Sequence, residues 1–247
     1  MLKLTPVLLA MVHAFVLYRL SAWRTKRALR ARSSVLVEDP ALGRLNARMA
    51  RTLALPRLEV HIYEVDAING LAAPDGRLFV TRGFYDAYRA GAVTAAELAS
   101  VIAHELGHVA LGHSRRRMID FSFQNAMRTV VATILNRILP GLGLVAANLM
   151  AGLVSARLSR QDEYEADAYA AALLHKSGIG TGAQKSLLAK LERLASGPAA
   201  RPPAWLSSHP ATAQRIQAIE RMEARWAASC PRGPRRLGPP AEPAGDP

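Results

Sequence analysis

Two histidines one helical turn apart place the strongest constraint on how this chain folds. They stand in the run His104-Glu105-Leu106-Gly107-His108, and the preceding Thr94-Ala-Ala-Glu97 is a capping box that predicts a helix running to about His113. At 100° per residue, the two imidazoles differ by about 40° and project from one face. Two neutral imidazoles at that spacing can hold one Zn²⁺, and the carboxylate of Glu105 can act on a zinc-bound water. The alternative is a solvated helix that carries two histidines by chance.

A catalytic zinc ion needs a third protein ligand and an open position. His113 is the nearest candidate, but it lies on the opposite side of the helix from His104, which favours a cap or a supporting role. A metzincin pattern needs glycine at 111 and histidine at 114, where this chain has Leu111 and Ser114, so that subclass is excluded. The third ligand is therefore expected from a later segment.

Acidic residues in the run Glu163-Tyr164-Glu165-Ala166-Asp167 can supply that ligand. Glu163 and Asp167 are four positions apart and share one face of a helix. One of the two can ligate zinc, while the other accepts a hydrogen bond from the far nitrogen of a ligand histidine and fixes its tautomer. Alone, such a cluster is a solvated helix face in most proteins, so its meaning depends on the histidine pair.

Four sequence blocks occur in order along the chain: Asn69–Thr81, Ile102–Val109, Arg160–Tyr169 and Ser208–Ile216. Together they resemble the membrane-associated, M48-like zinc metallopeptidase family that includes HtpX, BepA, the Oma-type peptidases and the CAAX prenyl proteases. Any one block is a weak signal, whereas four in the family's order are a strong one. The match covers residues 58–220, which is about two-thirds of the chain.

The resemblance implies one zinc ion per chain, held by His104, His108 and Glu163, with Asp167 supporting a ligand histidine from outside. It also implies that Glu105 is the general base, which takes a proton from the zinc-bound water and passes it to the leaving amine. Glu165 lies about 160° around the helix from Asp167 and is therefore ranked behind Glu163 as the ligand.

The same resemblance implies that His209 and Arg215 reach the active site. Either side chain can stabilise the oxyanion that develops during peptide hydrolysis. A neutral His209 can instead fill the fourth zinc position in a resting state. The alternative for the pair is structural, with a helix that starts near Pro210 and a salt bridge made by Arg215.

The predicted fold is α+β and predominantly helical, a gluzincin-type zinc metallopeptidase domain with a small sheet over residues 38–230. Residues 58–65 alternate apolar and polar and predict a half-buried strand, and turn residues follow at 69–70 and 74–76. A second short strand consists of Arg77, Leu78, Phe79, Val80 and Thr81. The resemblance implies that this strand presents a free edge on which an extended peptide substrate pairs. Further helices are expected over residues 41–55, from a second capping box at 181–184 to 195, and from Pro210 onward.

The N-terminus predicts a membrane anchor over residues 1–23. Residues 4–23 are mostly apolar and reach about 30 Å as a helix, enough to cross a bilayer. A basic juxtamembrane segment, residues 24–37, follows with five cations between Arg24 and Arg32. The positive-inside rule then favours an uncleaved single-pass anchor in a bacterial inner membrane, with the catalytic domain in the cytoplasm. The periplasmic face is the alternative.

A second hydrophobic segment, residues 129–156, lies between the two halves of the metal site. A single crossing there would put Glu163 and His104 on opposite sides of the membrane, so the segment cannot cross once. It is expected to form a helical hairpin that lies on the membrane, dips into it or covers the active-site groove. Burial in the soluble core is the alternative.

The net charge of +13, from 32 Lys and Arg against 19 Asp and Glu, indicates an anionic partner. Cations near the hydrophobic segment, at positions 115–117, 128, 157 and 160, favour an anionic lipid membrane. Aromatic residues are not interleaved with these cations, so nucleic acid is not expected. One cysteine, Cys230, excludes an intramolecular disulfide framework, and the Pro-rich tail over 231–247 is predicted to be disordered.

These observations predict a membrane-anchored zinc metalloendopeptidase that acts on polypeptides. The resemblance adds unfolded or membrane-associated proteins as substrates, in membrane protein quality control. Two other functions stay open: a membrane-bound chaperone or adaptor that keeps the zinc site but cuts little, and a metal hydrolase that does not cleave peptides. The sequence does not indicate an oligomeric state.

Overall fold

The computed structural model describes residues 31–36, 39–73, 75–113, 143–195 and 213–229, with single positions such as Leu29, Arg116, Trp205 and His209. The chain is α+β and mostly helical, as predicted. In chain order the elements are β1 (Ser33–Leu36), α2 (Pro40–Thr52), β2 (Val60–Tyr63), β3 (Gly70–Ala72), β4 (Leu78–Thr81), α3 (Arg82–Arg89), α4 (Ala95–Ala110), α6 (Gly143–Lys176), α7 (Gly182–Ala195) and α9 (Ala213–Ser229).

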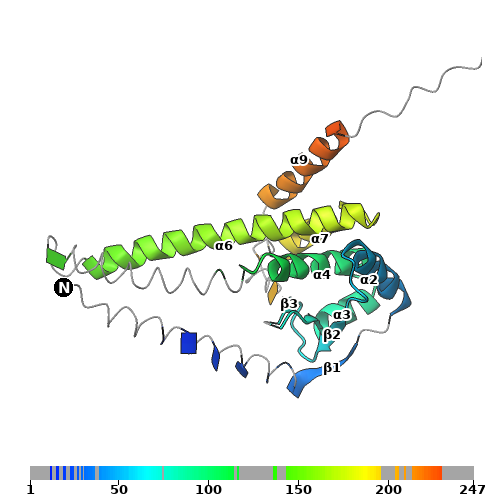
Figure 1. The fold of residues 1–247 in the computed structure, drawn as a ribbon, viewed down its shortest axis with the longest axis horizontal. Coiled ribbons are helices and arrows are strands. Elements are labelled where there is room, and N and C mark those ends of the chain that lie inside the picture. Colours follow the sequence, from blue (N-terminus) through cyan, green and yellow to red (C-terminus); the bar gives the residue numbers. More distant parts are fainter. Residues whose placement is uncertain are drawn as a thin grey trace, which may run out of the picture.

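Helix α4 is the centre of the fold. It begins with the predicted capping box, in which Thr94 accepts from the Glu97 backbone N–H and Glu97 accepts from that of Thr94. Every residue from Glu97 to His108 is buried, because α2, α6, α7, β3 and β4 all pack around this helix. Figure 1 shows α4 between the long α6 on one side and the sheet on the other. The histidine pair therefore lies inside the protein, and the alternative of a solvated helix is wrong.

The close packing of α4 against α6 depends on a glycine between the two histidines. A Cβ built on Gly107 would lie 3.0 Å from both the Cα and the carbonyl oxygen of Ala166. Such a contact is tighter than ordinary van der Waals packing, so any larger residue would push the helices apart. Around this contact, fully buried side chains fill the core, among them Phe84, Leu98, Ile102, Leu174 and Ile219.

Among the described residues, four strands form one sheet in the order β1-β2-β4-β3. β4 pairs with β2 in parallel and with β3 in antiparallel register, so it lies inside the sheet. The prediction that residues 77–81 present a free edge is therefore wrong. All four residues of β4 are buried, as is typical of an interior strand.

The sheet contains two strands that the sequence pattern did not predict. β3 begins at Gly70, within the expected turn, and it forms one edge of the sheet. β1 lies in the segment predicted to be a basic juxtamembrane stretch, and it pairs with β2 at the opposite edge. Beside it, Leu29 is buried against Phe79 and Ala73. The folded domain therefore begins before residue 38.

The predicted helices at 41–55, at 181–195 and after Pro210 correspond to α2, α7 and α9. The second capping box is wrong, however, although α7 begins where it was expected. The side-chain amide of Gln184 donates to Asp167 over 3.3 Å, and its Oε1 accepts no hydrogen bond among the described residues. Gln184 thus faces the interior instead of capping its own helix.

Residues 143–156 of the second hydrophobic segment form the first part of α6, which continues without a break into the acidic run. Val145, Leu149 and Leu153 recur every four residues along it and are 64%, 66% and 63% exposed, so the alternative of core burial is wrong for them. Figure 1 shows this part of α6 extending well beyond α4 and the sheet. Of residues 129–142, only Asn136 and Arg137 belong to the described part of the chain.

Among the described residues, no helix combines the length and apolarity needed to span a bilayer. Most of the predicted anchor, residues 1–23, and all of the predicted tail, residues 231–247, lie outside the described part of the chain.

Asp39 gives a first testable prediction because it caps α2. Its Oδ1 accepts from the backbone N–H groups of Ala41 and Leu42 at 2.9 Å each, and from the Tyr88 hydroxyl at 2.8 Å. Burial opposes the charge of Asp39, but these hydrogen bonds outweigh it and lower its pKa below the ordinary value. Asp39→Ala is expected to lower the free energy of unfolding by about 1–2 kcal/mol at neutral pH, measured by urea unfolding.

The same carboxylate makes the free energy of unfolding depend on pH. A pKa that is lower in the folded state gives stability that is present above the unfolded pKa of about 4 and is lost as pH falls through the folded value. Wild type is therefore expected to lose stability in that acidic range, and Asp39→Ala to lose less. The control is Asp39→Asn, which keeps a capping oxygen without the charge. Equal acid sensitivity in wild type and Asp39→Ala would contradict the assignment.

Candidate metal centre

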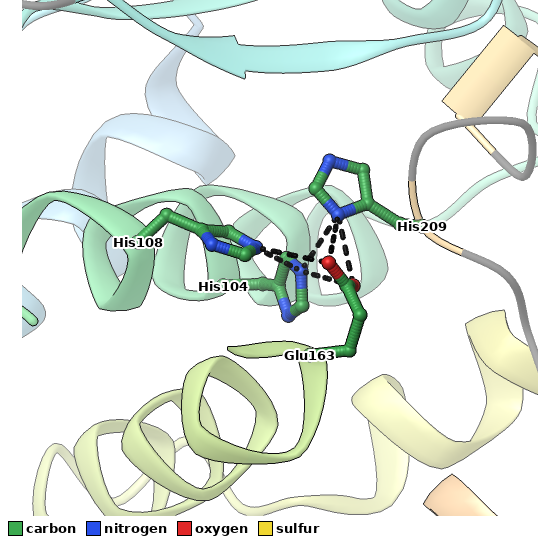
Figure 2. A group of neighbouring side chains, drawn as sticks. All are labelled: His104, His108, Glu163 and His209. Atoms are coloured by element: carbon green, nitrogen blue, oxygen red, sulfur yellow. Dashed lines mark hydrogen bonds and ion pairs between the residues drawn. The ribbon is translucent and has the colours of Figure 1, made fainter. Parts of the chain in front are cut away.

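Two helices bring three ligand-type side chains together in the interior. His104 and His108 come from α4, and Glu163 comes from α6; all three are at least 91% buried. The Nε2 atoms of the two histidines are 3.1 Å apart, and the Glu163 oxygens lie 3.4 Å from the first and 3.6 Å from the second. Figure 2 shows the three groups pointing toward one another.

These distances fit a tetrahedral metal ion. Ligand atoms about 2.1 Å from zinc at tetrahedral angles are separated by about 3.4 Å from one another. The donor set of two imidazoles and one carboxylate is also the set that catalytic zinc sites use when a fourth position is kept for water or substrate. The residues present therefore fit a divalent metal of the zinc type.

His209 completes the group as a fourth member. Its Nδ1 lies 2.9 Å and 3.0 Å from the two Glu163 oxygens and 3.4 Å from His104 Nε2. Donor atoms of all four residues lie within 4.8 Å of one another. Trp205 fixes the position of His209. The two rings stack with centroids 5.2 Å apart, and the backbone N–H of His209 donates to the Trp205 carbonyl. The side chain thus stands where a fourth metal ligand would stand.

Glu105 lies beside this group without joining it. Its side chain is 6% exposed, and its Oε1 makes no hydrogen bond with any described residue, although His209 Nε2 lies 3.5 Å from it. A buried carboxylate oxygen without a hydrogen bond costs stability, so this oxygen is suited to pair with a further group such as water or substrate.

Behind His104, Asp167 accepts from the imidazole, with Oδ1 3.0 Å from Nδ1. Arg215 holds the same carboxylate with two hydrogen bonds, of 2.6 Å from Nε and 2.8 Å from Nη2. Burial opposes the charge of Asp167, but the bonds from Arg215 and His104 outweigh it and hold its pKa at about 2. The carboxylate therefore stays ionised and fixes His104 with Nε2 directed at the metal position.

Arg215 accordingly makes the salt bridge that was the structural alternative for this residue. Its Nη1 also donates to the His209 carbonyl at 3.3 Å and lies 3.7 Å from Glu163 Oε2. The described structure places Arg215 behind the site, next to Asp167. Its role at the oxyanion stays a prediction.

Comparison with protein families decides which class this site belongs to. The model of peptidase family M48 matches residues 37–223, which is most of the chain. The chain belongs to peptidase family M48. It is thus a member of a metal-dependent peptidase family, and the resemblance inferred from the four sequence blocks is confirmed.

Named relatives of this M48 member include two from Escherichia coli K12. Metalloprotease LoiP is 33% identical over 66% of this chain and 62% of its own length, and metalloprotease YcaL is 34% identical over 64% and 59%. The beta-barrel assembly-enhancing protease of Escherichia coli O157:H7 is 30% identical over 74% of this chain and 39% of its own length. The chain therefore spans about three-fifths of the first two relatives and less of the third.

Among the described residues, the edge strand of the sheet nearest the metal centre of this M48 member is β3. A Cβ built on Gly70 would lie 2.5 Å from Val101 Cγ1 and 3.6 Å from Glu105 Cγ, so β3 runs directly along α4 beside the predicted base. Only glycine allows this approach without a shift of the buried Val101 side chain. The sequence pattern missed the strand because Asn69-Gly70 has the composition of a turn.

Sequence reasoning also missed the side chains that hold the ligands in place. Gln184 donates to Asp167, and Trp205 stacks on His209, but neither belongs to a motif with a chemical signature. Arg116 was grouped with the lipid-facing cations, and its Nη1 donates to Glu165 Oε2 at 2.7 Å, a contact that the sequence did not predict. Its lipid-facing role stays a prediction. For His113, where a cap or a supporting role was expected, the structure places Nδ1 2.7 Å from His108 Nδ1.

Proposed function

We propose that this chain is a zinc-dependent metalloendopeptidase. The observation that carries the proposal is the buried group of His104, His108 and Glu163, with the Glu105 carboxylate beside it making no hydrogen bond from Oε1. Zinc held by the three ligands would polarise the scissile carbonyl and lower the pKa of its bound water. Glu105 takes the proton of the attacking water and gives it to the leaving amine.

The other residues of the site hold this machinery in position. Asp167 fixes the tautomer of His104, and Arg215 keeps Asp167 ionised and in place. The β3 edge pairs with the extended substrate backbone next to Glu105, which replaces the role first expected for residues 77–81. Peptide-bond cleavage within a polypeptide, rather than at its end, follows from a strand edge that accepts chain on both sides of the scissile bond.

The substrates and location are part of the same proposal. Unfolded or membrane-associated polypeptides suit a site that recognises backbone, and one relative is named for enhancing beta-barrel assembly. An anchor over residues 1–23, with the catalytic domain facing the cytoplasm, keeps the enzyme at a membrane. The exposed stripe of Val145, Leu149 and Leu153 on α6, followed by the cations Arg157 and Arg160, supports contact with an anionic lipid surface.

Metal removal tests the proposal on the full chain in detergent. Purified protein is expected to cleave unfolded casein, to lose this activity after dialysis against a chelator, and to regain it with one equivalent of zinc but not with calcium. Product lengths on a gel report whether cleavage is internal. Activity that survives loss of all bound metal, or zinc-loaded protein that cleaves no unfolded substrate, would overturn the peptidase assignment.

A substitution of His209 tests whether the proposed enzyme has a resting state in which this side chain blocks the metal. Because its Nδ1 lies among the ligand atoms, it is expected to occupy the fourth position in a resting state and to compete with water. His209→Ala is then expected to raise kcat/KM for casein by roughly tenfold, the factor that applies if about nine-tenths of the molecules rest in the blocked state. A fall in kcat at unchanged zinc content would contradict this and assign His209 to the oxyanion.

A further inference from the structure

Behind His108, on the side away from Glu163, three side chains form a continuous hydrogen-bonded chain. His113 is 1% exposed, and its Nδ1 lies 2.7 Å from the Nδ1 of His108. The other nitrogen of His113, Nε2, lies 3.3 Å from Glu165 Oε2. Arg116 donates to the same Glu165 oxygen at 2.7 Å and thereby keeps the carboxylate ionised and in place.

When His108 serves as a ligand, only one placement of the ring protons allows both hydrogen bonds, from His108 to His113 and from His113 to Glu165. His108 presents Nε2 to the metal group, so the proton of its neutral ring resides on Nδ1. A hydrogen bond between two Nδ1 atoms needs one donor and one acceptor, so the Nδ1 of His113 must accept. The proton of His113 then resides on Nε2, where the Glu165 carboxylate accepts it. Each step determines the next.

The backbone after α4 aims His113 at this position. Gly112 has φ = +65°, in the left-handed region that ends helices, and its N–H donates to the Val109 carbonyl. The regular helix therefore ends immediately after α4, and the ring of His113 lies against that of His108, with their centroids 4.8 Å apart. Along a continued helix, position 113 would lie well around the axis from position 108.

The two ligand histidines are thus supported in the same way, over different distances. On the His104 side, the Asp167 carboxylate accepts directly from the ring and is held by Arg215. On the His108 side, the Glu165 carboxylate is held by Arg116, and His113 bridges the gap to the ring.

We propose that His113 is a positioning residue for the metal centre. By accepting from the Nδ1 of His108, it fixes the tautomer and the ring orientation that leave Nε2 available as a ligand. Glu165 in turn fixes the tautomer of His113. The inference rests on the proposed function only in that a metal ion is the group for which His108 is positioned.

Zinc binding by two variants of the full chain tests this role. Asparagine at 113 keeps a polar atom near the former Nδ1, whereas phenylalanine keeps the ring volume and removes the acceptor. His113→Phe is expected to raise the zinc dissociation constant, measured by chelator competition, by about 10–100-fold. His113→Asn is expected to keep it within several-fold of wild type. Cobalt substitution adds a spectroscopic signature, since the visible ligand-field bands should shift in His113→Phe and not in His113→Asn.

A second pair of variants covers the case in which His113→Phe does not fold. Glu165→Ala removes the acceptor of His113, and Gln161→Ala removes a neighbour that donates to Glu165 without touching His113. Glu165→Ala is expected to weaken zinc binding several-fold, and Gln161→Ala to leave it unchanged. Equal zinc affinity in wild type and Glu165→Ala would overturn the positioning role.

The outcomes separate this inference from the proposed function. Folded His113→Phe that binds zinc as tightly as wild type overturns the positioning role alone. His113→Asn weakened as much as His113→Phe also overturns it, because ring packing rather than the acceptor would then matter. Wild type that binds no zinc overturns the peptidase proposal, and the positioning role with it.

Discussion

Replacing Glu105 by glutamine is expected to abolish peptidase activity while zinc content stays that of wild type. The amide has the shape of the carboxylate but cannot take a proton from water, so general-base catalysis is lost. That loss typically costs about 10²–10⁴-fold in kcat. Glu105 does not itself join the ligand group, so the metal should remain bound. Casein hydrolysis and the zinc content of the same sample measure the two effects together.

Glu97 offers a matched control for that substitution. It is the other buried glutamate of α4, and its oxygens bond Lys190, Ser186 and the backbone of Thr94. Glu97→Gln should therefore affect stability and not kcat. If Glu105→Gln cleaves casein at the wild-type rate, Glu105 is not the base. If the variant loses cleavage but supports every cellular phenotype, the chaperone or adaptor function is the better account.

The two residue pairs of the candidate metal centre, one on α4 and one on α6, were predictable because each depends on the local periodicity of a helix. The four-residue spacing of His104 and His108, and that of Glu163 and Asp167, places each pair on one helix face whatever the rest of the chain does. Spacing alone left open which carboxylate ligates and which supports. The packing of α6 on α4 through Gly107 places Glu163 within 3.6 Å of the Nε2 atoms of both histidines and Asp167 beside the Nδ1 of His104, which favours Glu163 as the ligand.

The sheet was harder to predict because strand order depends on pairing between distant segments. Leu78, Phe79 and Val80 form a short apolar run that fits an edge or an interior strand, and only the pairing of β4 on both sides decides between them. β3 has three residues and starts with glycine, so its local pattern is that of a turn. Strands this short are fixed by their neighbours more than by their own composition.

The contacts that hold the candidate ligands in place could not be predicted from the sequence for a related reason. His113 lies opposite His104 on a continued helix, and only the turn at Gly112 brings it beneath His108. Gln184 fits a capping box equally well by sequence, yet it faces Asp167 because α7 packs on α4. Such contacts arise where helices from distant parts of the chain meet, so a local sequence pattern does not predict them.

Loss of the carboxylate of Glu163 is expected to have the largest effect on metal binding. Near one zinc per chain is expected in detergent-purified wild type, and Glu163→Ala should lose it or bind it far more weakly. The effect should exceed the roughly 10–100-fold cost of losing a supporting hydrogen bond, because a ligand itself is removed. Glu163 also holds His209 through both of its oxygens, so the substitution loosens a second donor.

Two further variants make the Glu163 experiment decisive. In Glu163→Ala the three histidines still form a set that can bind zinc, so residual affinity is expected to disappear when His209→Ala is added. Glu165→Ala serves as a comparison, since it removes a carboxylate two residues away that contacts His113 and not the ligand group, and it is expected to weaken zinc binding only several-fold. Wild-type affinity in Glu163→Ala would refute a site built from two distant helices. No zinc in wild type after zinc loading would reduce the histidine pair to a coincidence and leave the adaptor function as the better account.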